Sequence, residues 1–577
     1  MIDALLVKSK IDISDMLLKG TIMFIVTFIV GFMFGKSSMM LAFVVLLGVN
    51  TFEKQNLRVQ TISKILRLIV IDTMIVTIAF LASRSRWWGI PVNMVALFSI
   101  IYYFVSPYDY MSYKTFVMLY IFAQYNQITL SELPNRVLLV IFVLLIALGT
   151  TIIKQYKNKA LLDEHIGQGW ESLHRQLMGM VRGGGYDEEF SLICSNHMNE
   201  VAHSIYLTGY KQYLTTYVGK IQFQFYMNIS YFNILLRQLN VMHQKGEYNQ
   251  FFLTELMVIT KCIDDYFKRQ VTRVEVIKVL HHFLESHSLV HGIEEELVDL
   301  IDSIYKNFVE MGRLDYKRRN KPYDEWQRSD LDRVQRRIKD SCHLKSMSFN
   351  FAIRMSIMLS ISLLLADLLG FYKIIWAIIP LVSITAPYYE ETLKKKEDRL
   401  GSNVLAALIV GVVANLIGTW WINVVLLIAG YYLIYAFKDY YRMSFFLTIV
   451  SMSLSTYGDN VNTLVFYRII YVIVGATVAE LSARLFPYKI EDGIKELVRE
   501  IDKLNEVLEA QSIASLEGKE NKHDIRDTII HSAVLCQKLY LKNQSYKDSK
   551  ITELININTE FCIRLGHKLL RDHKVTV

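Results

Sequence analysis

The chain has 577 residues, of which 52% are hydrophobic and 20% are charged, and its net charge is +8 at neutral pH. This balance favours a membrane protein with sizeable water-facing parts over a single globular domain. Cytoplasmic loops of membrane proteins carry such a surplus of Lys and Arg, so we exclude nucleic acid as a partner. The five cysteines share no CxxC spacing, which argues against a metal site and against a disulfide scaffold.

An apolar block at about 20–153 comes first and predicts six membrane segments. Their ranges are 17–34, 37–52, 66–83, 92–106, 112–124 and 136–153. A straight helix needs ~20 apolar residues to cross a bilayer, so the shorter segments predict kinks or tight hairpins. No small-residue cleavage site follows the first run, and we expect it to be retained as a transmembrane helix.

A polar region at about 154–348 follows. Its apolar residues recur at three- and four-residue steps, which predicts amphipathic helices packed in a bundle. The run Arg182–Gly185 is expected to separate two of these helices. The basic stretch Arg328–Lys345 is interpreted either as a contact with anionic lipid headgroups or as a solvated helix face.

A second apolar block predicts six further segments, at 349–370, 374–388, 402–419, 421–436, 443–455 and 467–486. Between the second and third of them we expect a charged loop that carries Lys394, Lys395, Lys396 and Arg399. A helical region at 488–577 closes the chain. Because Lys and Arg gather on this loop and on the 53–67 connection, the positive-inside rule places both termini and both hydrophilic regions in the cytoplasm.

The two apolar blocks show signs of an internal duplication. Lys36 and Glu53 stand 17 residues apart, and Lys373 and Glu390 repeat that spacing. Further markers occur in the same order in both blocks: Trp87–Trp88 with Trp420–Trp421, Tyr102–Tyr103 with Tyr431–Tyr432, and Arg136 with Arg468. We therefore predict an all-α polytopic membrane protein with two parallel repeats of six transmembrane helices, each followed by a cytoplasmic helical domain. The predicted domains are 1–153, 154–348, 349–487 and 488–577.

The second segment of each repeat is short, and Pro380 and Pro387 interrupt the second copy. Matched short or broken segments in two halves indicate the substrate site of a transporter. Lys36 and Lys373 stand at the mouths of these segments, where each could attract a carboxylate. Trp376, one turn beyond Lys373, could stack on an aromatic group or on a cation. The alternative is that both lysines extend to the lipid headgroups.

Ionisable residues inside apolar segments are costly and are therefore functional candidates. Desolvation favours the protonated form of a carboxyl group, so three acids are candidates for proton coupling: Asp72, Asp367 and Glu480. The alternative for each acid is a structural pair with an arginine. A second group is interpreted as an inner gate or as structural salt bridges: Glu53, Glu390, Arg354 and Arg399.

The second block resembles the fusaric-acid-resistance-like (FUSC) family, which includes the aromatic acid exporters. The residues that carry the resemblance are Phe351–Arg354, Lys373, Trp376–Ala377, Pro387, Arg399–Ser402, Tyr467–Ile470, Gly475–Ala479 and Pro487. The first repeat departs from the family, because Ile62-Ser63-Lys64 stands where the family loop carries a glycine.

The resemblance implies a bacterial inner-membrane homodimer that contacts membrane lipids. It implies proton-driven export of small aromatic organic acids, with no enzymatic activity and no cofactor. Two alternatives stay open at this point. One is a passive organic-anion channel, since plant malate channels are distantly similar in design, and the other is an envelope scaffold or regulator that transports nothing.

Overall fold

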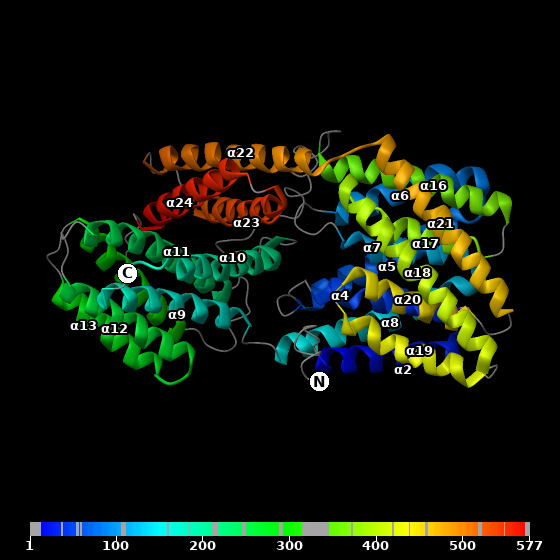
Figure 1. Cartoon of the computed structure of the whole chain (residues 1–577), viewed down its shortest axis with the longest axis horizontal. Helices are drawn as coiled ribbons and strands as arrows, with labels where there is room; N and C mark the ends of the chain where they lie inside the picture. The colour runs from blue at the N-terminus through cyan, green and yellow to red at the C-terminus, as the bar shows by residue number, and fades with distance from the viewer. Residues whose placement is uncertain are drawn as a thin grey trace. The chain divides into compact units, whose positions relative to one another are not determined.

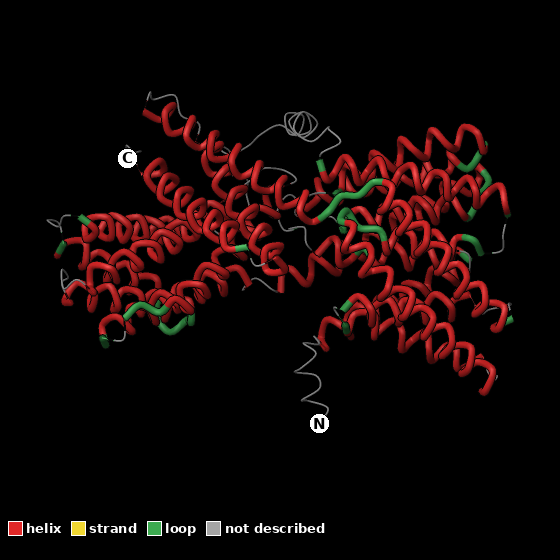
Figure 2. The backbone as a smooth tube through the Cα atoms, turned by 45° about the horizontal axis from the view of Figure 1, so that its top comes forward, coloured by secondary structure: helices red, strands yellow, loops and turns green. Residues whose placement is uncertain are grey.

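The structure is a computed structural model of the whole chain. It describes residues 13–35, 38–53, 57, 61–105, 111–157, 161–183, 185–210, 217–244, 250–287, 292–313, 346–370, 373–417, 420–437, 439–455, 460–516, 522–546 and 548–571. The regular structure of these residues is helical throughout, without a strand (Figures 1 and 2). Lys36 and the basic stretch Arg328–Lys345 lie outside the described residues.

The chain divides into two compact units. The first, called here the membrane unit, comprises Met1–Lys54, Ile62–Thr151 and Arg337–Gly493. Its first half contains α2 (Ile13–Phe34), α3 (Met39–Leu47), α4 (Val49–Glu53), α5 (Thr61–Ala82), α6 (Arg86–Phe104), α7 (Tyr113–Tyr125) and most of α8 (Leu133–Lys157). Its second half contains α16 (Met347–Leu369), α17 (Ile375–Ile384), α18 (Tyr389–Ile417), α19 (Trp420–Ala436), α20 (Tyr440–Ser455) and α21 (Val461–Leu485).

Each predicted membrane segment overlaps one of these helices, or α3 and α4 together. Among the described residues, seven helices are long and apolar enough to cross a membrane. Other apolar helices, α17 among them, are shorter. Phe32 is 91% exposed and Leu416 is 81% exposed within the unit, which suits contact with lipid tails. The helices therefore indicate a multi-pass membrane protein.

The prediction of a charged loop at Lys394–Arg399 is wrong, because these residues lie inside α18. The helix begins directly after the break at Pro387, with Glu390 and Glu391 in its first turn, where carboxylates interact favourably with the helix dipole. No glycine or proline interrupts the chain from Tyr389 to Leu400, so the helix continues through the charges into the apolar segment.

Helix ends explain the short α17. Gly370 takes the left-handed conformation (φ 57°) that ends α16, and Lys373 takes φ 53° just before α17. A left-handed backbone is unfavourable for a residue with a Cβ atom. α17 contains Pro380 and ends at Ile384.

Packing joins the two halves of the membrane unit. α6 packs against α16, and α2 packs against α19. α17 contacts α7 and lies along α21, where a Cβ atom added at Gly475 would come within 2.3 Å of the Ala377 carbonyl oxygen. Only glycine permits this approach of the two helices. The apolar core between α18, α20 and neighbouring helices is built on Ala406, Ala407, Val410, Ile449 and Met452.

The second unit comprises Gln55–Thr61, Ile152–Arg336 and Ile494–Val577. It contains α9 (Leu161–Val181), α10 (Glu188–Tyr210), α11 (Tyr217–Gln244), α12 (Gln250–Phe267), α13 (Arg273–Ser286), α14 (Ile293–Arg313), most of α22 (Ile490–Leu516), α23 (Lys522–Tyr546) and α24 (Ser549–Arg571). The predicted break at Arg182–Gly185 falls between α9 and α10. The C-terminal helices pack on the middle region, since α23 contacts α10 and α24 contacts α11 (Figure 1).

Candidate functional site

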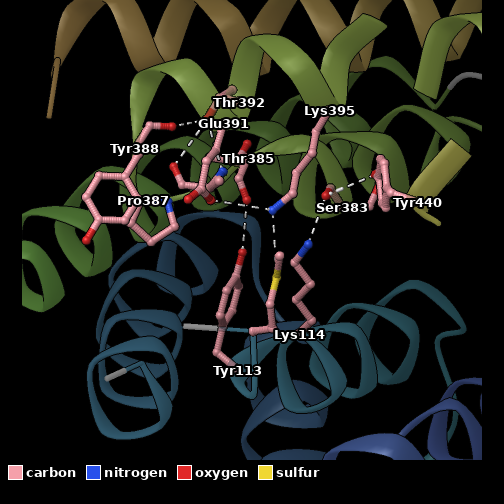
Figure 3. A network of polar contacts seen from close by, with 12 residues as sticks. Tyr113, Lys114, Ser383, Thr385, Pro387, Tyr388, Glu391, Thr392, Lys395 and Tyr440 are labelled. Carbon is pink, nitrogen blue, oxygen red and sulfur yellow. Dashed lines mark hydrogen bonds and ion pairs between the residues drawn. The ribbon is translucent and has the colours of Figure 1, made fainter. Parts of the chain in front are cut away.

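The candidate site in the membrane unit starts at the C-terminal end of α17. A helix end leaves its last carbonyl groups without partners in the helix. Tyr113 on α7 donates a hydrogen bond to the Thr385 carbonyl oxygen (3.3 Å), and the Lys114 ammonium donates one to the Ser383 carbonyl oxygen (2.9 Å). The Tyr440 hydroxyl donates to the same Ser383 oxygen (3.2 Å). Figure 3 shows α7 side chains reaching from the first half to the broken segment of the second.

Arg354 binds the backbone between α17 and α18, where Pro387 breaks the helix. The arginine is 1% exposed, and its guanidinium donates to the carbonyl oxygens of Phe486 (3.1 Å), Pro387 (3.4 Å) and Ala386. Thr392 accepts a hydrogen bond from the Ala386 N–H (3.1 Å). Arg354, predicted as a gate or salt-bridge residue, thus holds backbone carbonyls and forms no ion pair with a described acid.

Positive charge exceeds negative charge near the break. Lys114, Lys395 and Arg399 lie close enough to interact electrostatically. Glu391 is the acid beside them, and its carboxylate is 3.9 Å from the Lys395 ammonium. The Lys395 side chain is 13% exposed, so the contact is largely shielded from water (Figure 3).

A second group of polar residues lies deeper, between α18, α20 and α21. We call it the arginine centre and define it by Arg399, Asn403, Ser444, Thr448 and Arg468. The two arginines are each 1% exposed, and Ser444 and Thr448 are fully buried. Arg399 donates to the Ser444 hydroxyl (2.8 Å), and Arg468 donates to the Asn403 amide oxygen (2.9 Å). Thr448 donates to the same amide oxygen (2.9 Å), so one network links both guanidinium groups.

Trp376 lies beside the arginine centre. Its ring centroid is 5.4 Å from Cζ of Arg468 and 5.3 Å from Nζ of Lys373, and the tryptophan is 2% exposed. Both distances are in the range of cation–π contacts. The structure therefore brings Lys373 and Trp376 together with Arg468. Lys36 lies outside the described residues, so its predicted role is unaddressed.

The three candidate proton carriers lie apart from this group. Asp72 on α5 is 2% exposed, and its Oδ1 atom has no hydrogen-bond partner among the described residues. Asp367 on α16 forms an ion pair with Arg86 on α6 (2.6 Å). Glu480 on α21 forms ion pairs with Lys396 (2.5 Å) and Arg484 (2.6 Å).

Glu53 and Glu390 do not converge on one contact. Glu53 binds the Lys19 ammonium at 2.8 Å, and Lys19 also binds Asp15 at 3.0 Å. Glu390 accepts a hydrogen bond from the backbone N–H of Ile490 (3.2 Å). Each glutamate therefore has its own structural partner.

Sequence reasoning missed most of the arginine centre. Arg468 was used as a marker of the duplication and of the family resemblance but not as a site residue, and Lys114, Asn403, Ser444 and Thr448 were not singled out. A signal was present, because Arg399 with Asn403 and Ser444 with Thr448 are polar pairs four residues apart in apolar helices, and such pairs share one helix face. No group of three His, Cys, Asp or Glu residues in the described part of the chain could hold a metal ion.

Comparison with known proteins gave one match. Residues 360–481 match a family model described as fusaric acid resistance protein-like. This confirms the predicted resemblance for the segment that contains α17, α18 and most of α21. No curated protein and no solved structure matched the chain.

Proposed function

We propose that this chain is a secondary transporter that exports small aromatic organic acids across a bacterial plasma membrane. The family match at residues 360–481 and the apolar helices support a transport or efflux role. The observation that carries the choice of an anionic substrate is the buried positive charge beside the broken α17. Lys114, Lys395, Arg399 and Arg468 gather there, with Glu391 as the acid in contact.

The transporter is proposed to consist of two six-helix repeats, with its termini in the cytoplasm, and to form a homodimer. The helix contacts support the repeats. The helix of the fourth segment of the first half, α6, packs on the first helix of the second half, α16, where α3 and α4 together count as the second segment. Reciprocally, the first helix of the first half, α2, packs on the fourth helix of the second, α19. Two copies related by a pseudo-twofold axis would exchange contacts in this way.

Lys373 and Lys36 are proposed to attract the substrate carboxylate at the mouths of the two short segments. Lys373 adopts a left-handed backbone beside Trp376. Strained backbone persists where the surrounding structure requires it, and it is common at functional sites. Trp376 is proposed to hold the cations of the site in place, because its ring already contacts Lys373 and Arg468.

Asp72 is the proposed proton carrier. Burial disfavours a charged carboxylate, and no described residue forms a hydrogen bond with the Asp72 Oδ1 atom to offset this cost. Asp367 and Glu480 have cationic partners, which stabilise their ionised forms, so they are weaker candidates for proton release and uptake.

The experiment is flux into and out of proteoliposomes that contain the purified chain. The panel consists of aromatic carboxylates with a second polar group, tested well above their carboxyl pKa so that passive leakage of the neutral acid is small. We expect saturable flux that an imposed pH gradient accelerates. Matched aromatic amides and protein-free liposomes are the controls. Absence of protein-dependent flux for every acid would overturn the proposal.

A passive organic-anion channel is the second candidate. The pairing of Asp367 and Glu480 favours it, since two of the three membrane acids are already neutralised by cations. A channel would conduct anions down their own gradient, and substitution of Asp72 would leave the current intact. Planar-bilayer recordings with and without a pH gradient distinguish the two candidates.

A further inference from the structure

Two buried arginines in the arginine centre are neutralised by no acid among the residues that the structure describes. Arg399 and Arg468 lie close enough to repel each other electrostatically, and neither forms a salt bridge with a described residue. Their polar partners are the neutral side chains of Ser444, Asn403 and Thr448, together with the Tyr440 hydroxyl beside Arg399. A buried charge without a counter-charge is strongly unfavourable, and two adjacent like charges increase the cost.

Part of each guanidinium group is unused. Four of the guanidinium nitrogens are buried and form no hydrogen bond of ordinary geometry with any described residue. They are Nε and Nη2 of Arg399 and Nε and Nη1 of Arg468. The Tyr440 hydroxyl does lie close enough to Arg399 to interact with it. The two nitrogens of Arg399, Nε and Nη2, lie on the same side of its guanidinium and match the two oxygens of a carboxylate, because this fork binds carboxylates in a bidentate manner.

The neighbouring residues hold the guanidinium groups in position. Asn403 donates through its amide nitrogen to the Arg399 carbonyl oxygen (2.9 Å) and to the Ser444 hydroxyl (3.2 Å), while its amide oxygen accepts from Arg468. Trp376 lies over the Arg468 guanidinium. The arginines are therefore fixed before a ligand arrives, which lowers the entropy cost of binding.

We propose that the arginine centre is an anion-binding site that takes the carboxylate of one small organic acid between Arg399 and Arg468. The identity of the ligand rests on the proposed function, whereas the presence of the site can be tested without transport. The burial of both arginines disfavours a phospholipid headgroup, whose glycerol and two acyl chains would have to follow the phosphate inside the helix bundle.

The test is equilibrium binding of radiolabelled benzoate to the full chain in nanodiscs. We expect saturable binding of one benzoate per chain, displaced by unlabelled benzoate and unaffected by benzamide, its neutral analogue. Hydrogen bonds to charged groups contribute about 1.5–3 kcal/mol, so Arg399→Gln and Arg468→Gln should each weaken binding roughly 10- to 150-fold. The matched control is Arg442→Gln on α20, where the exposed arginine lies outside the arginine centre and affinity should stay within about twofold of wild type.

Three results would overturn the site: unchanged affinity in both glutamine variants, equal displacement by benzamide, or displacement by chloride at the same concentration as benzoate. If a glutamine variant fails to fold, thermal unfolding of the wild type decides the matter. At equal ionic strength, benzoate should then raise the melting temperature of the wild type more than benzamide does. Arg399→Lys should reduce the rise that benzoate causes. Binding without flux in proteoliposomes would reject the proposed function alone, and flux without this binding would reject the site alone.

Discussion

The Nε atom of Arg86 lies 2.6 Å from the Oδ2 atom of Asp367, and this ion pair links α6 of the first half to α16 of the second. A cavity of about 150 Å³ lies beside it and is lined by both residues and by Asn93 and Gln124. The side chains are 57% and 38% exposed, so the pair lies at the surface of the unit, where ion pairs contribute little. The contribution of this ion pair to the free energy of folding is therefore small. Because it links the two halves, it could instead open and close when the halves move during transport.

Asp367→Asn should leave the free energy of unfolding within about 1 kcal/mol of the wild type, because exposed ion pairs contribute little. If the pair opens during transport, the variant should change the flux rate in proteoliposomes. The charge exchange Arg86→Asp with Asp367→Arg should restore the wild-type rate. Equal flux in all three proteins would show that the pair has no part in the transport cycle.

Asp72→Asn should abolish the acceleration of flux by a pH gradient. The amide cannot take up or release a proton as a carboxyl group does, and Asp72 is a buried acid whose Oδ1 atom has no hydrogen-bond partner among the described residues. Exchange of labelled for unlabelled substrate without a gradient should continue. Asp439→Asn, an exposed acid just before α20, is the control and should keep its gradient dependence. A gradient response that survives in Asp72→Asn would exclude this residue as the carrier.

Ser444→Ala should destabilise the chain by about 1–3 kcal/mol, because it removes the acceptor of three buried donors, one of which is the charged Arg399. The Ser444 hydroxyl oxygen accepts hydrogen bonds from Arg399 (2.8 Å), Ser402 (2.9 Å) and Asn403 (3.2 Å). Ser362→Ala on α16 is the matched control, since its hydroxyl only donates to the Met358 carbonyl of its own helix (2.8 Å). Thermal unfolding in detergent measures both variants, and equal losses would contradict the role given to Ser444.

Lys373→Gly separates the backbone of Lys373 from its charge. The left-handed conformation at this position disfavours residues with a Cβ atom by about 1–2 kcal/mol. The glycine variant should therefore be more stable than Lys373→Gln, although both lack the ammonium. Flux should fall equally in both if the ammonium attracts substrate. A flux defect in the glutamine variant alone would indicate a backbone effect.

The second unit should lose stability in mild acid. Nδ1 of His165 and Nδ1 of His197 are 3.2 Å apart, so one of the two nitrogens must be unprotonated. Partial burial, followed by the proximity of His165, lowers the pKa of His197 below its usual value. Because the unfolded chain then binds the proton more readily, stability is complete above the ordinary histidine pKa of about 6.5 and falls as pH decreases through that value toward the lowered pKa.

His197→Asn should flatten this pH dependence, measured as the melting temperature of the full chain across the same pH range. His282→Asn on α13 replaces an exposed histidine and should leave the slope unchanged. A slope that is the same in the wild type and in His197→Asn would assign the acid sensitivity to other groups, of which His174 is one, since burial also lowers its pKa.

The helices could be predicted from the sequence because hydrophobicity and its period act locally. Apolar runs located the membrane segments, and Pro387 marked the break after α17. The error at Lys394–Arg399 has a physical reason. Charged side chains were taken to indicate a loop, but glutamate, lysine and arginine are good helix formers, and the helix dipole favours Glu390 and Glu391 in the first turn of α18.

The sequence by itself determined the all-helical class, the positions of the membrane helices and the resemblance at residues 360–481. It also indicated the short, broken segment beside Lys373 and Trp376 as a candidate site. Only the tertiary structure decided which charges are neutralised. Asp367 lies 281 positions along the chain from its partner Arg86, and Arg468 lies 65 positions from Asn403. Such pairs depend on how distant helices pack, and no local pattern specifies that packing. The same packing leaves Arg399 and Arg468 buried together, and neither forms an ion pair with an acid in the described part of the chain.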